Sequence, residues 1–290
     1  MLRKVLFPVA GFGTRMLPVT KVVPKELLPI LNRPAIEYVV DEALNSGFDS
    51  FIFVISYGKE AIIDYFDVDL GLRSFLAERK KESLLDLIKE IESKVKTLSA
   101  VRQKIPEGLG HAVLSAERLV GKEPFAVILG DDLIDAEPPC LKQMKELYLE
   151  LSAQTEIHSL VALEEVSLEE VSKYGIVEGE RISDNLIKIK RMVEKPAPEE
   201  APSNLAIVGR YIFHPAIFEY LKRIPKKGGE YQLTDAMQLM IEEGYPFYGY
   251  IFQGIRLDTG NPKGYFKAIL HYASKDPELR EILKSFSFEI

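Results

Sequence analysis

The opening of the chain, residues 1–55, constrains the fold more than any other segment. Residues 2–10 form a short apolar run that Gly11 ends, which is typical of a buried strand. Residues 11–34 contain four prolines and are too interrupted for a helix. Apolar residues then recur at helical spacing from Ile36 to Leu44, and residues 51–55 form a second apolar run. Because strand, long loop, helix and strand begin a βαβ unit, we predict an α/β fold with a mostly parallel sheet.

The remaining pattern extends this prediction. Further strands are expected at residues 98–103, 125–129, 176–177, 187–193 and 205–213. Residues 70–96 favour a charged amphipathic helix that covers the domain, with a short coiled coil as the weaker alternative. Helix N-caps are expected at Asn32, Thr234, Asn261 and Asp276. No internal repeat or low-complexity linker divides the chain, so we expect one domain over residues 1–290 with a C-terminal helix at 274–290.

Composition narrows the class of protein. Hydrophobic residues make up 47% and charged residues 28%, which suits a globular fold. No apolar run approaches the roughly 18 residues that span a bilayer, and the run behind Arg3 and Lys4 is too short for a signal peptide. The single cysteine, Cys140, cannot build a disulfide framework or a thiolate zinc site. We therefore expect a cytoplasmic protein with no membrane partner.

Charge is distributed unevenly along the chain. The net charge of −7 argues against nucleic acid as a partner, because phosphate backbones are bound by basic surfaces. Residues 1–33, however, carry six basic side chains against Glu26 alone. An acidic protein with one basic segment suits a small anionic ligand.

A glycine-containing loop, Gly11 to Arg15, directly follows the first strand. Two glycines allow the backbone to approach a phosphate closely and to point N–H groups at its oxygens. The loop lacks the third glycine of the dinucleotide fingerprint and the Gly-Lys-Ser/Thr of the P-loop. Glycines alone therefore leave a plain tight turn and a ligand loop equally open, but Arg15, Lys21 and Lys25 in the same segment favour a phosphate ligand.

Residues 11–18 (GFGTRMLP) and 24–30 (PKELLPI) closely resemble the opening of the sugar-phosphate nucleotidyltransferases. The resemblance continues along the whole chain and implies a single α/β domain with a Rossmann-like, mixed and mostly parallel sheet flanked by helices, and a smaller sugar-facing lobe. It implies that residues 1–135 mainly bind nucleotide and 136–273 mainly bind sugar phosphate. It also implies a set of nucleotide-binding residues in the loop, namely Ala10, Gly11, Gly13, Thr14, Arg15 and Lys25.

Two aspartates, Asp131 and Asp132, follow the strand at 125–129. Ligands of α/β proteins bind at the carboxyl ends of parallel strands, and one carboxylate plus phosphate oxygens is a usual arrangement for Mg²⁺. Taken alone, a paired aspartate is more often part of a structural turn, and Asp258 could equally be a turn residue. The resemblance implies instead that Asp131 and Asp258 hold Mg²⁺.

A Glu194-Lys195 pair ends another predicted strand, where a solvated face is the ordinary reading. The resemblance implies that Glu194 binds sugar hydroxyls, that Lys195 contacts the sugar phosphate and that Gly175 lets the sugar approach the backbone. A carboxylate suits hydroxyl donors, and a lysine suits a phosphate dianion. Further residues assigned to the sugar-phosphate side are Asp132, Asn204, Gly209 and His111.

Gln103 and Gly108 resemble the base-binding element of the UTP–glucose-1-phosphate uridylyltransferases, in which a glutamine reads the edge of uracil. A glutamine can pair with both an acceptor and an N–H on that ring. Gln103, Gly108 and Asp131 therefore join the predicted nucleotide site. We predict that His111 opens a helix packed near the base and is not a general base.

The resemblance implies transfer of a uridylyl group from UTP to glucose 1-phosphate, giving UDP-glucose and pyrophosphate. The expected catalytic residues are Arg15, Lys25, Asp131 and Lys195. The alternatives are a thymidylyltransferase that uses dTTP and a non-catalytic nucleotide sensor. The sequence leaves open whether the sugar is glucose or galactose, and the family relationship implies a homodimer or homotetramer.

Overall fold

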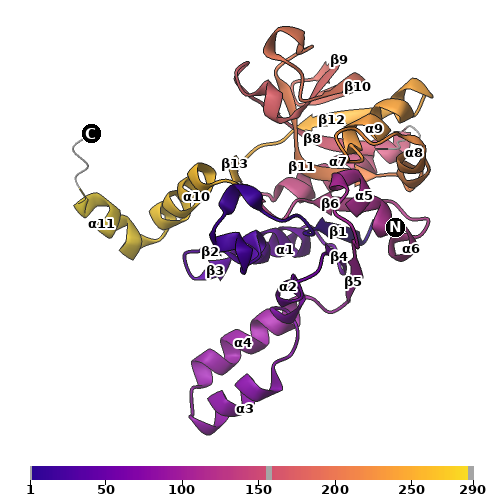
Figure 1. Cartoon of the computed structure of the whole chain (residues 1–290). Coiled ribbons are helices and arrows are strands. Elements are labelled where there is room, and N and C mark those ends of the chain that lie inside the picture. The colour runs from indigo at the N-terminus through magenta and orange to yellow at the C-terminus, as the bar shows by residue number, and fades with distance from the viewer. Residues whose placement is uncertain (1, 155–158, 287–290) are drawn as a thin grey trace.

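The computed structural model describes residues 2–154 and 159–286, and its centre is a nine-stranded sheet in the order β5-β4-β1-β6-β11-β8-β12-β10-β9 (Figure 1). The first four strands are mutually parallel, as the opening of the chain predicts. They are β1 (Lys4–Pro8), β4 (Ser50–Ile55), β5 (Leu98–Arg102) and β6 (Phe125–Ile128).

The second part of the sheet is mixed. Its strands are β8 (Ser159–Glu165), β9 (Gly175–Ser183), β10 (Leu186–Glu194), β11 (Leu205–Phe213) and β12 (Phe247–Ile251). β11 runs antiparallel to β6, β8 and β9, and β10 runs antiparallel to β9 and β12, whereas β8 and β12 are parallel. All the described strands of this sheet except β10 and β11 therefore point one way, which confirms the mixed, mostly parallel sheet.

On one side of β11 the pairing strand changes from β6 to β9, and a cavity lies at this change. β6 pairs with β11 from Arg210 onward, and β9 pairs with the same strand at Ala206. Residues 207–209 lie between these two pairings and line a cavity. β9 pairs with β11 as well as with β10, and the last strands of the sheet form a lobe at the top of the view (Figure 1).

Helices cover both faces of the sheet, which explains why its central strands are continuously apolar. Val5 and Phe7 of β1 face one core, and Leu6 faces the other. The first core is completed by α1 (Ala35–Asn45) and α7 (Cys140–Gln154). The second is completed by α5 (Gly108–Ser115), α6 (Glu117–Val120), α8 (Ile217–Arg223) and α9 (Leu233–Glu242).

A small ribbon joins distant parts of the chain. β7 (Asp132–Asp135) pairs antiparallel with β13 (Ile255–Asp258), with Asp132 opposite Asp258. The helices α10 (Pro262–Lys275) and α11 (Pro277–Ser285) follow β13 and lead away from the body (Figure 1). Asn261 and Asp276 cap these helices as predicted, while residues 287–290 of the expected C-terminal helix lie outside the described residues.

Three local predictions are wrong. α1 begins at Ala35 after Pro34, because Asn32 lies in the turn between β2 (Pro29–Ile30) and β3 (Arg33–Pro34). Thr234 lies inside the first turn of α9, which begins at Leu233, and its hydroxyl bonds Glu194 instead of the helix backbone. The segment at 70–96 forms two helices, α3 (Leu70–Glu78) and α4 (Glu82–Lys94), which project from the body and do not cover it (Figure 1).

The other short elements are α2 (Ala61–Asp64) and the 3₁₀ turns η1 (Thr14–Met16), η2 (Val19–Lys21), η3 (Lys25–Leu27), η4 (Val171–Lys173) and η5 (Pro198–Glu200). Within the described residues, no helix has both the length and the apolar character needed to span a bilayer.

Candidate active site

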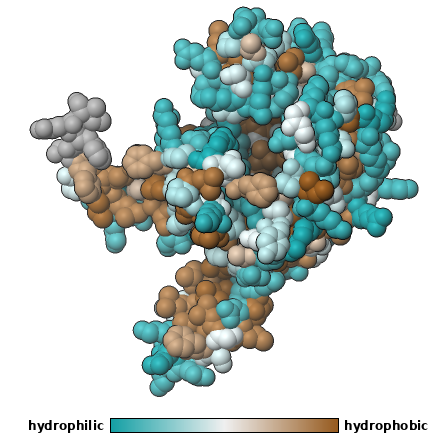
Figure 2. Space-filling model, in the orientation of Figure 1, coloured by the Kyte–Doolittle hydropathy of each residue, from teal (hydrophilic) through white to brown (hydrophobic). Residues whose placement is uncertain are grey.

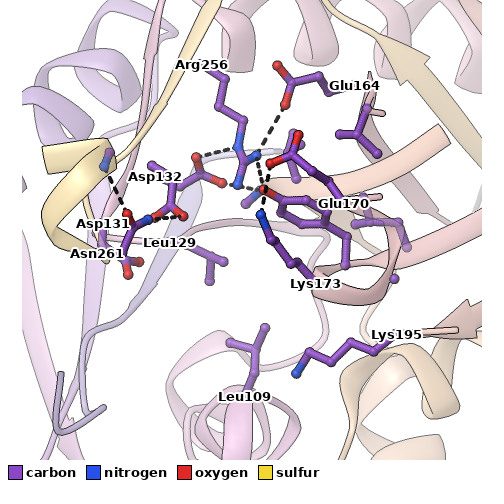
Figure 3. Close-up of a pocket in the computed structure, with 18 of the residues that line it drawn as sticks. Leu109, Leu129, Asp131, Asp132, Glu164, Glu170, Lys173, Lys195, Arg256 and Asn261 are labelled. Atoms are coloured by element: carbon purple, nitrogen blue, oxygen red, sulfur yellow. Dashed lines mark hydrogen bonds and ion pairs between the residues drawn. The ribbon is translucent and has the colours of Figure 1, made fainter. Parts of the chain in front are cut away.

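A cavity of about 900 Å³ lies between the parallel half of the sheet and the β9–β10 lobe. Figure 2 shows the hollow beneath this lobe, and Figure 3 shows the side chains that line it. Asp131 follows the carboxyl end of β6, and Lys195 reaches toward the cavity from the other side (Figure 3). This is the position at which open α/β sheets bind ligands.

The glycine loop wraps back on itself beside the cavity. Gly13 has φ of 65°, a left-handed conformation that glycine adopts without strain, and its carbonyl accepts a hydrogen bond of 2.9 Å from the Thr20 hydroxyl. This turn leads into η1, which carries Arg15 to the cavity wall. A side chain at Gly13 would press on Thr20 and Lys25, at 3.2 and 3.4 Å.

Lys25 and Asp131 form an ion pair, with the lysine nitrogen 2.6 Å from Asp131 Oδ2. Both side chains are largely buried, with 17% and 15% of their surface exposed. Burial alone would raise the pKa of Asp131, but the nearby Lys25 ammonium outweighs it and holds the pKa below its ordinary value. Burial would likewise lower the pKa of Lys25, yet Asp131 raises it. Both groups are therefore charged at neutral pH.

A second buried pair lies beneath the first. Lys59 donates a 2.8 Å hydrogen bond to Glu26, whose side chain is 1% exposed. Glu26 packs under Gly130, where a Cβ atom would lie 3.1 Å from Glu26 Cγ. Burial raises the pKa of Glu26 and lowers the pKa of Lys59 more than their attraction compensates. The Lys25–Asp131 pair therefore lies next to a second buried pair, in which burial disfavours the charged forms.

Asp131 and Asp258 converge although 126 residues separate them in the chain. A Cβ atom on Gly260 would collide with Asp131 Oδ2 and would lie 3.0 Å from Asp258 Oδ1. It would lie 2.8 Å from a guanidinium nitrogen of Arg15, so the three charged groups surround one point. The backbone amide and hydroxyl of Thr259 both donate to the Asp131 carbonyl, at 2.7 and 2.8 Å, and fix this approach.

These two carboxylates fit a magnesium ion. Both place hard oxygen donors near one point beside Gly260, and Mg²⁺ is commonly held by one or two carboxylates plus phosphate oxygens and water. Among residues 2–154 and 159–286, no three His, Cys, Asp or Glu side chains gather as a metal site. A metal here would therefore depend on ligands supplied by a substrate.

The opposite wall of the cavity is built by residues of β9, β10 and α9. Glu194 accepts a 2.7 Å hydrogen bond from the Thr234 hydroxyl. A side chain at Gly175 would meet Thr234 Oγ1 at 3.0 Å and Glu194 Oε2 at 3.4 Å, so glycine keeps this wall open. Lys195 has φ of 44°, a left-handed conformation that is costly for a non-glycine residue and typical of functional sites.

Asp132 is held entirely by the protein. Its Oδ1 accepts a hydrogen bond of 2.7 Å from Arg256, and its Oδ2 accepts one of 2.9 Å from the Gly209 amide. Asp132 is 4% exposed, and a Cβ atom on Gly209 would collide with it at 2.8 Å. Both residues line the cavity as predicted, but this bonding favours a supporting role for Asp132 over direct contact with sugar.

Gln103, Gly108 and His111 cluster at the end of β5. The Gln103 amide nitrogen lies 3.2 Å from the Gly108 carbonyl and 3.1 Å from His111 Nδ1. His111 Nδ1 also lies 3.1 Å from the Ile105 carbonyl. The His111 ring therefore packs against the proposed base-reading glutamine, at the start of a helix as predicted, and orients it.

The comparisons with known proteins identify the family. The family model described as nucleotidyl transferase matches residues 5–275. The chain belongs to the nucleotidyl transferase family. Within it, the chain is 41% identical over 290 residues to a UTP–glucose-1-phosphate uridylyltransferase of Staphylococcus haemolyticus, covering 100% of this chain and 98% of that relative.

Solved structures of the nucleotidyl transferase family agree with the fold. A UDP-glucose pyrophosphorylase complexed with UDP-glucose superimposes with a TM-score of 0.85 at 46% identity, covering 95% of this chain and 100% of that one. A UTP-bound enzyme of the same type from Acinetobacter baumannii superimposes with a TM-score of 0.89 at 39% identity, covering 100% of both chains.

In this nucleotidyl transferase the predicted residues do not all reach the cavity. Its lining includes Arg15, Asp131, Asp132, Gly175, Glu194, Lys195, Gly209 and Asp258. Ala10, Gly11, Gly13, Thr14, Lys25, Gln103, Gly108 and His111 lie outside this lining, in and around the glycine loop and the β5–α5 connection. Asn204 lies outside it too, with its amide directed to the Val166 carbonyl at 3.3 Å.

Sequence reasoning missed several lining residues, among them Thr234, Tyr174, Glu164 and Arg256. Thr234 gave a misleading signal because threonine before a helix is typical of an N-cap. Arg256 carried a usable signal, since it lies two residues before Asp258 and, on a strand, points to the same face as Asp258.

Proposed function

We propose that this nucleotidyl transferase moves a uridylyl group from UTP to glucose 1-phosphate and forms UDP-glucose and pyrophosphate. The observation that carries the proposal is the convergence of Arg15, Asp131 and Asp258 around Gly260, in a cavity whose other wall holds Lys195. Relatives with this named activity match essentially the whole chain. To bind two phosphorylated substrates side by side, a site needs positive side chains for the phosphates and carboxylates that can hold a metal ion.

The reaction requires no protein nucleophile. A phosphate oxygen of glucose 1-phosphate forms a bond to the α-phosphorus of UTP, while the bond from that phosphorus to the leaving pyrophosphate breaks. The attacking oxygen is already ionised at neutral pH, so no base has to remove a proton, and His111 serves only binding. Catalysis then consists of positioning and electrostatic stabilisation.

The basic residues hold the triphosphate. Arg15 and Lys25 neutralise its charge and that of the departing pyrophosphate. Lys25 pairs with Asp131 in the free protein, so it shifts toward the phosphates when nucleotide binds. Asp131 and Asp258 would hold Mg²⁺, which when bound relieves the repulsion between the phosphates of the two substrates.

The remaining residues select the substrates. Gln103, whose amide nitrogen contacts Gly108 and His111 in the free protein, would exchange these contacts for the edge of uracil when nucleotide binds. Glu194 accepts hydrogen bonds from sugar hydroxyls, and Lys195 binds the sugar phosphate. Because UTP and sugar phosphates are highly charged and do not cross membranes unaided, the proposal also implies a cytoplasmic enzyme.

A second copy of the chain is the proposed partner of the projecting helices. α3 and α4 expose Leu72, Phe75, Leu84 and Leu87, and Figure 2 shows apolar surface over this hairpin. Exposed apolar surface of this extent is typical of association sites. We expect a homodimer or homotetramer by light scattering. The double variant Leu84→Lys, Leu87→Lys should lower the mass if this hairpin is the interface, and an unchanged mass would exclude it.

Pyrophosphate release over a grid of nucleotides and sugar phosphates tests the function. UTP with glucose 1-phosphate should give the highest kcat/KM. Since one methyl group changes binding by only about 10- to 200-fold, dTTP is expected to react more slowly but measurably. Preference for dTTP would make the chain a thymidylyltransferase, and preference for galactose 1-phosphate would change the sugar. UTP binding without any pyrophosphate release would indicate a sensor.

A further inference from the structure

Arg256 bridges parts of the cavity wall that come from three different strands or loops. Its Nε donates to Asp132 on β7 at 2.7 Å, and its Nη1 donates to Glu164 on β8 at 3.2 Å. The same Nη1 donates to the Tyr174 hydroxyl at 3.2 Å, and the guanidinium lies 5.0 Å above the Tyr174 ring. Figure 3 shows these contacts converging on one side chain, which is only 10% exposed.

One side of this bridge leads to the carboxylates proposed for the metal. Arg256 lies two residues before Asp258 on β13, and its partner Asp132 lies opposite Asp258 in the ribbon and next to Asp131 in the chain. Asp132 also accepts a hydrogen bond from the Gly209 amide of β11, so the ribbon is attached to the part of β11 that lines the cavity. A change in Arg256 would therefore be transmitted to the ribbon.

The other side leads to the sugar-phosphate wall. Tyr174 immediately precedes Gly175, and its carbonyl accepts a 2.9 Å hydrogen bond from the Lys195 amide. Lys195 is the residue with φ of 44°, and strained conformations persist only where the surroundings enforce them. Tyr174 is thus held by Arg256 through its ring and hydroxyl, and it holds Lys195 through its backbone.

We propose that Arg256 is a positioning residue that fixes the distance from Asp258 on the ribbon, and from Asp131 just before it, to the loop bearing Lys195. The inference rests on the proposed function, because it assigns Arg256 the task of bringing the phosphates of the two substrates together. Three of its five guanidinium N–H groups, on Nε and Nη1, donate to protein groups, so we assign Arg256 an action through these neighbours. Small displacements of a reacting group lower rates strongly; about 1 Å can cost about 10²-fold.

The test compares Arg256→Gln with a matched control, Arg223→Gln. Arg223 also pairs with a carboxylate, Glu243, and stacks on a tyrosine, Tyr220, but it lies outside the cavity lining. We expect Arg256→Gln to lower kcat by about 10-fold or more and to raise KM for glucose 1-phosphate, while the Kd for UTP by calorimetry changes less than about 2-fold. Arg223→Gln should leave all three values unchanged.

Two further variants separate positioning from simple stabilisation. Arg256→Lys keeps the charge but cannot reach three partners at once, so it should not restore the KM for glucose 1-phosphate. Tyr174→Phe removes one bond of the bridge and should shift KM in the same direction by less. Its effect should be non-additive with Arg256→Gln, because both act on one contact.

Several outcomes would overturn the inference. Unchanged kcat and KM in Arg256→Gln, with only a lower melting temperature, would make the residue purely structural. Normal kcat and KM in Arg256→Lys would show that only the positive charge matters. A loss of UTP affinity in Arg256→Gln as large as the loss of glucose 1-phosphate affinity would show that the residue acts on the nucleotide site. A wild-type protein that does not react with UTP and glucose 1-phosphate would contradict the proposed function. An active wild type with an equally active Arg256→Gln variant would contradict only the role of Arg256.

Discussion

At the scale of single residues, charge is concentrated where the protein is least exposed. Lys25 pairs with Asp131, which lines the cavity, and the buried Glu26–Lys59 pair lies next to them. Charges in such places strongly influence both stability and function, because the surrounding medium screens them little. They are therefore the residues whose replacement distinguishes catalytic from structural roles.

Lys25→Ala should reduce turnover sharply. The variant removes the ammonium expected to stabilise the triphosphate, and loss of one stabilising donor typically lowers kcat by about 10²-fold or more. Lys21→Ala is the matched control, because Lys21 is an exposed lysine of the same loop, whereas Lys25 is largely buried and pairs with Asp131. Steady-state rates with circular dichroism to check folding make the comparison; near-normal turnover in Lys25→Ala would remove this lysine from the mechanism.

The buried pair of Arg210 and Glu42 should matter for stability. Arg210 is 0% exposed and donates two hydrogen bonds to Glu42, at 3.0 and 2.6 Å. Arg210→Met leaves a buried carboxylate without its partner, which should lower the free energy of unfolding by about 3–5 kcal/mol. The double variant with Glu42→Gln should recover part of this loss in urea denaturation. Equal stability of the single and double variants would mean that the two charges are not coupled.

The pH dependence of stability should report the Lys25–Asp131 pair. The pKa of Asp131 is lowered, so its ionised form contributes stability above the unfolded-state pKa, and this contribution is lost as pH falls through the folded-state value. The pKa of Lys25 is raised, so its contribution is lost only as pH rises through its folded-state value. Asp131→Asn should therefore be less stable than wild type at pH 7, with the difference vanishing in strong acid. A constant difference in urea unfolding across this range would contradict the ion pair.

At the scale of elements, helix starts and strand ends position the site. α10 begins with Asn261, whose Oδ1 accepts a 2.9 Å hydrogen bond from the Gly264 amide. The same side chain donates to Asp258 at 2.9 Å. One residue thus caps a helix and orients a carboxylate of the proposed metal site.

Asn261→Ala and Asp276→Ala form a natural pair of cap variants. Asp276 caps α11 in the same way, with its Oδ1 2.9 Å from the Leu279 amide, but it has no contact with the site. Loss of a cap costs about 1 kcal/mol, so denaturant unfolding should show a similar small loss in both variants. Only Asn261→Ala should also lower turnover. Equal turnover in the two would show that Asn261 does not orient Asp258.

At the scale of the whole molecule, one sheet spans both parts of the chain, which are predicted to bind nucleotide and sugar phosphate. The antiparallel pairing of β6 with β11 joins the parallel half to the mixed half. Both cores run along this sheet, and each contains residues from both parts of the chain. The boundary between residues 1–135 and 136–273 therefore separates two predicted binding functions, and it does not separate two hydrophobic cores.

Unfolding should accordingly be a single transition. Urea curves followed by circular dichroism and by tyrosine fluorescence are expected to coincide. UTP with magnesium at about 100 times its Kd should stabilise the protein by about 2.7 kcal/mol, because it binds only the folded state. Two separated transitions, with UTP shifting only one of them, would indicate two independent domains.

Much of the parallel half could be predicted from the sequence because its signals are local. β1, the irregular loop, α1 and β4 are each recognisable from apolar spacing, prolines and glycines within about a dozen residues. The caps Asn261 and Asp276 were equally readable, because a cap and its proline are adjacent. The amino-acid types of the proposed site were readable too, since phosphate, metal and hydroxyl ligands require particular side chains.

What only the tertiary structure decided is which distant residues meet. Asp258 reaches Asp131, Thr234 reaches Glu194 and Arg256 reaches Tyr174 because strand order and register bring them together. The sequence also does not determine that α3 and α4 project from the body (Figure 1), because an amphipathic pattern indicates an apolar face but not which surface packs against that face. A local pattern records the contacts of one turn or one strand, whereas contacts across a sheet depend on the path of the whole chain.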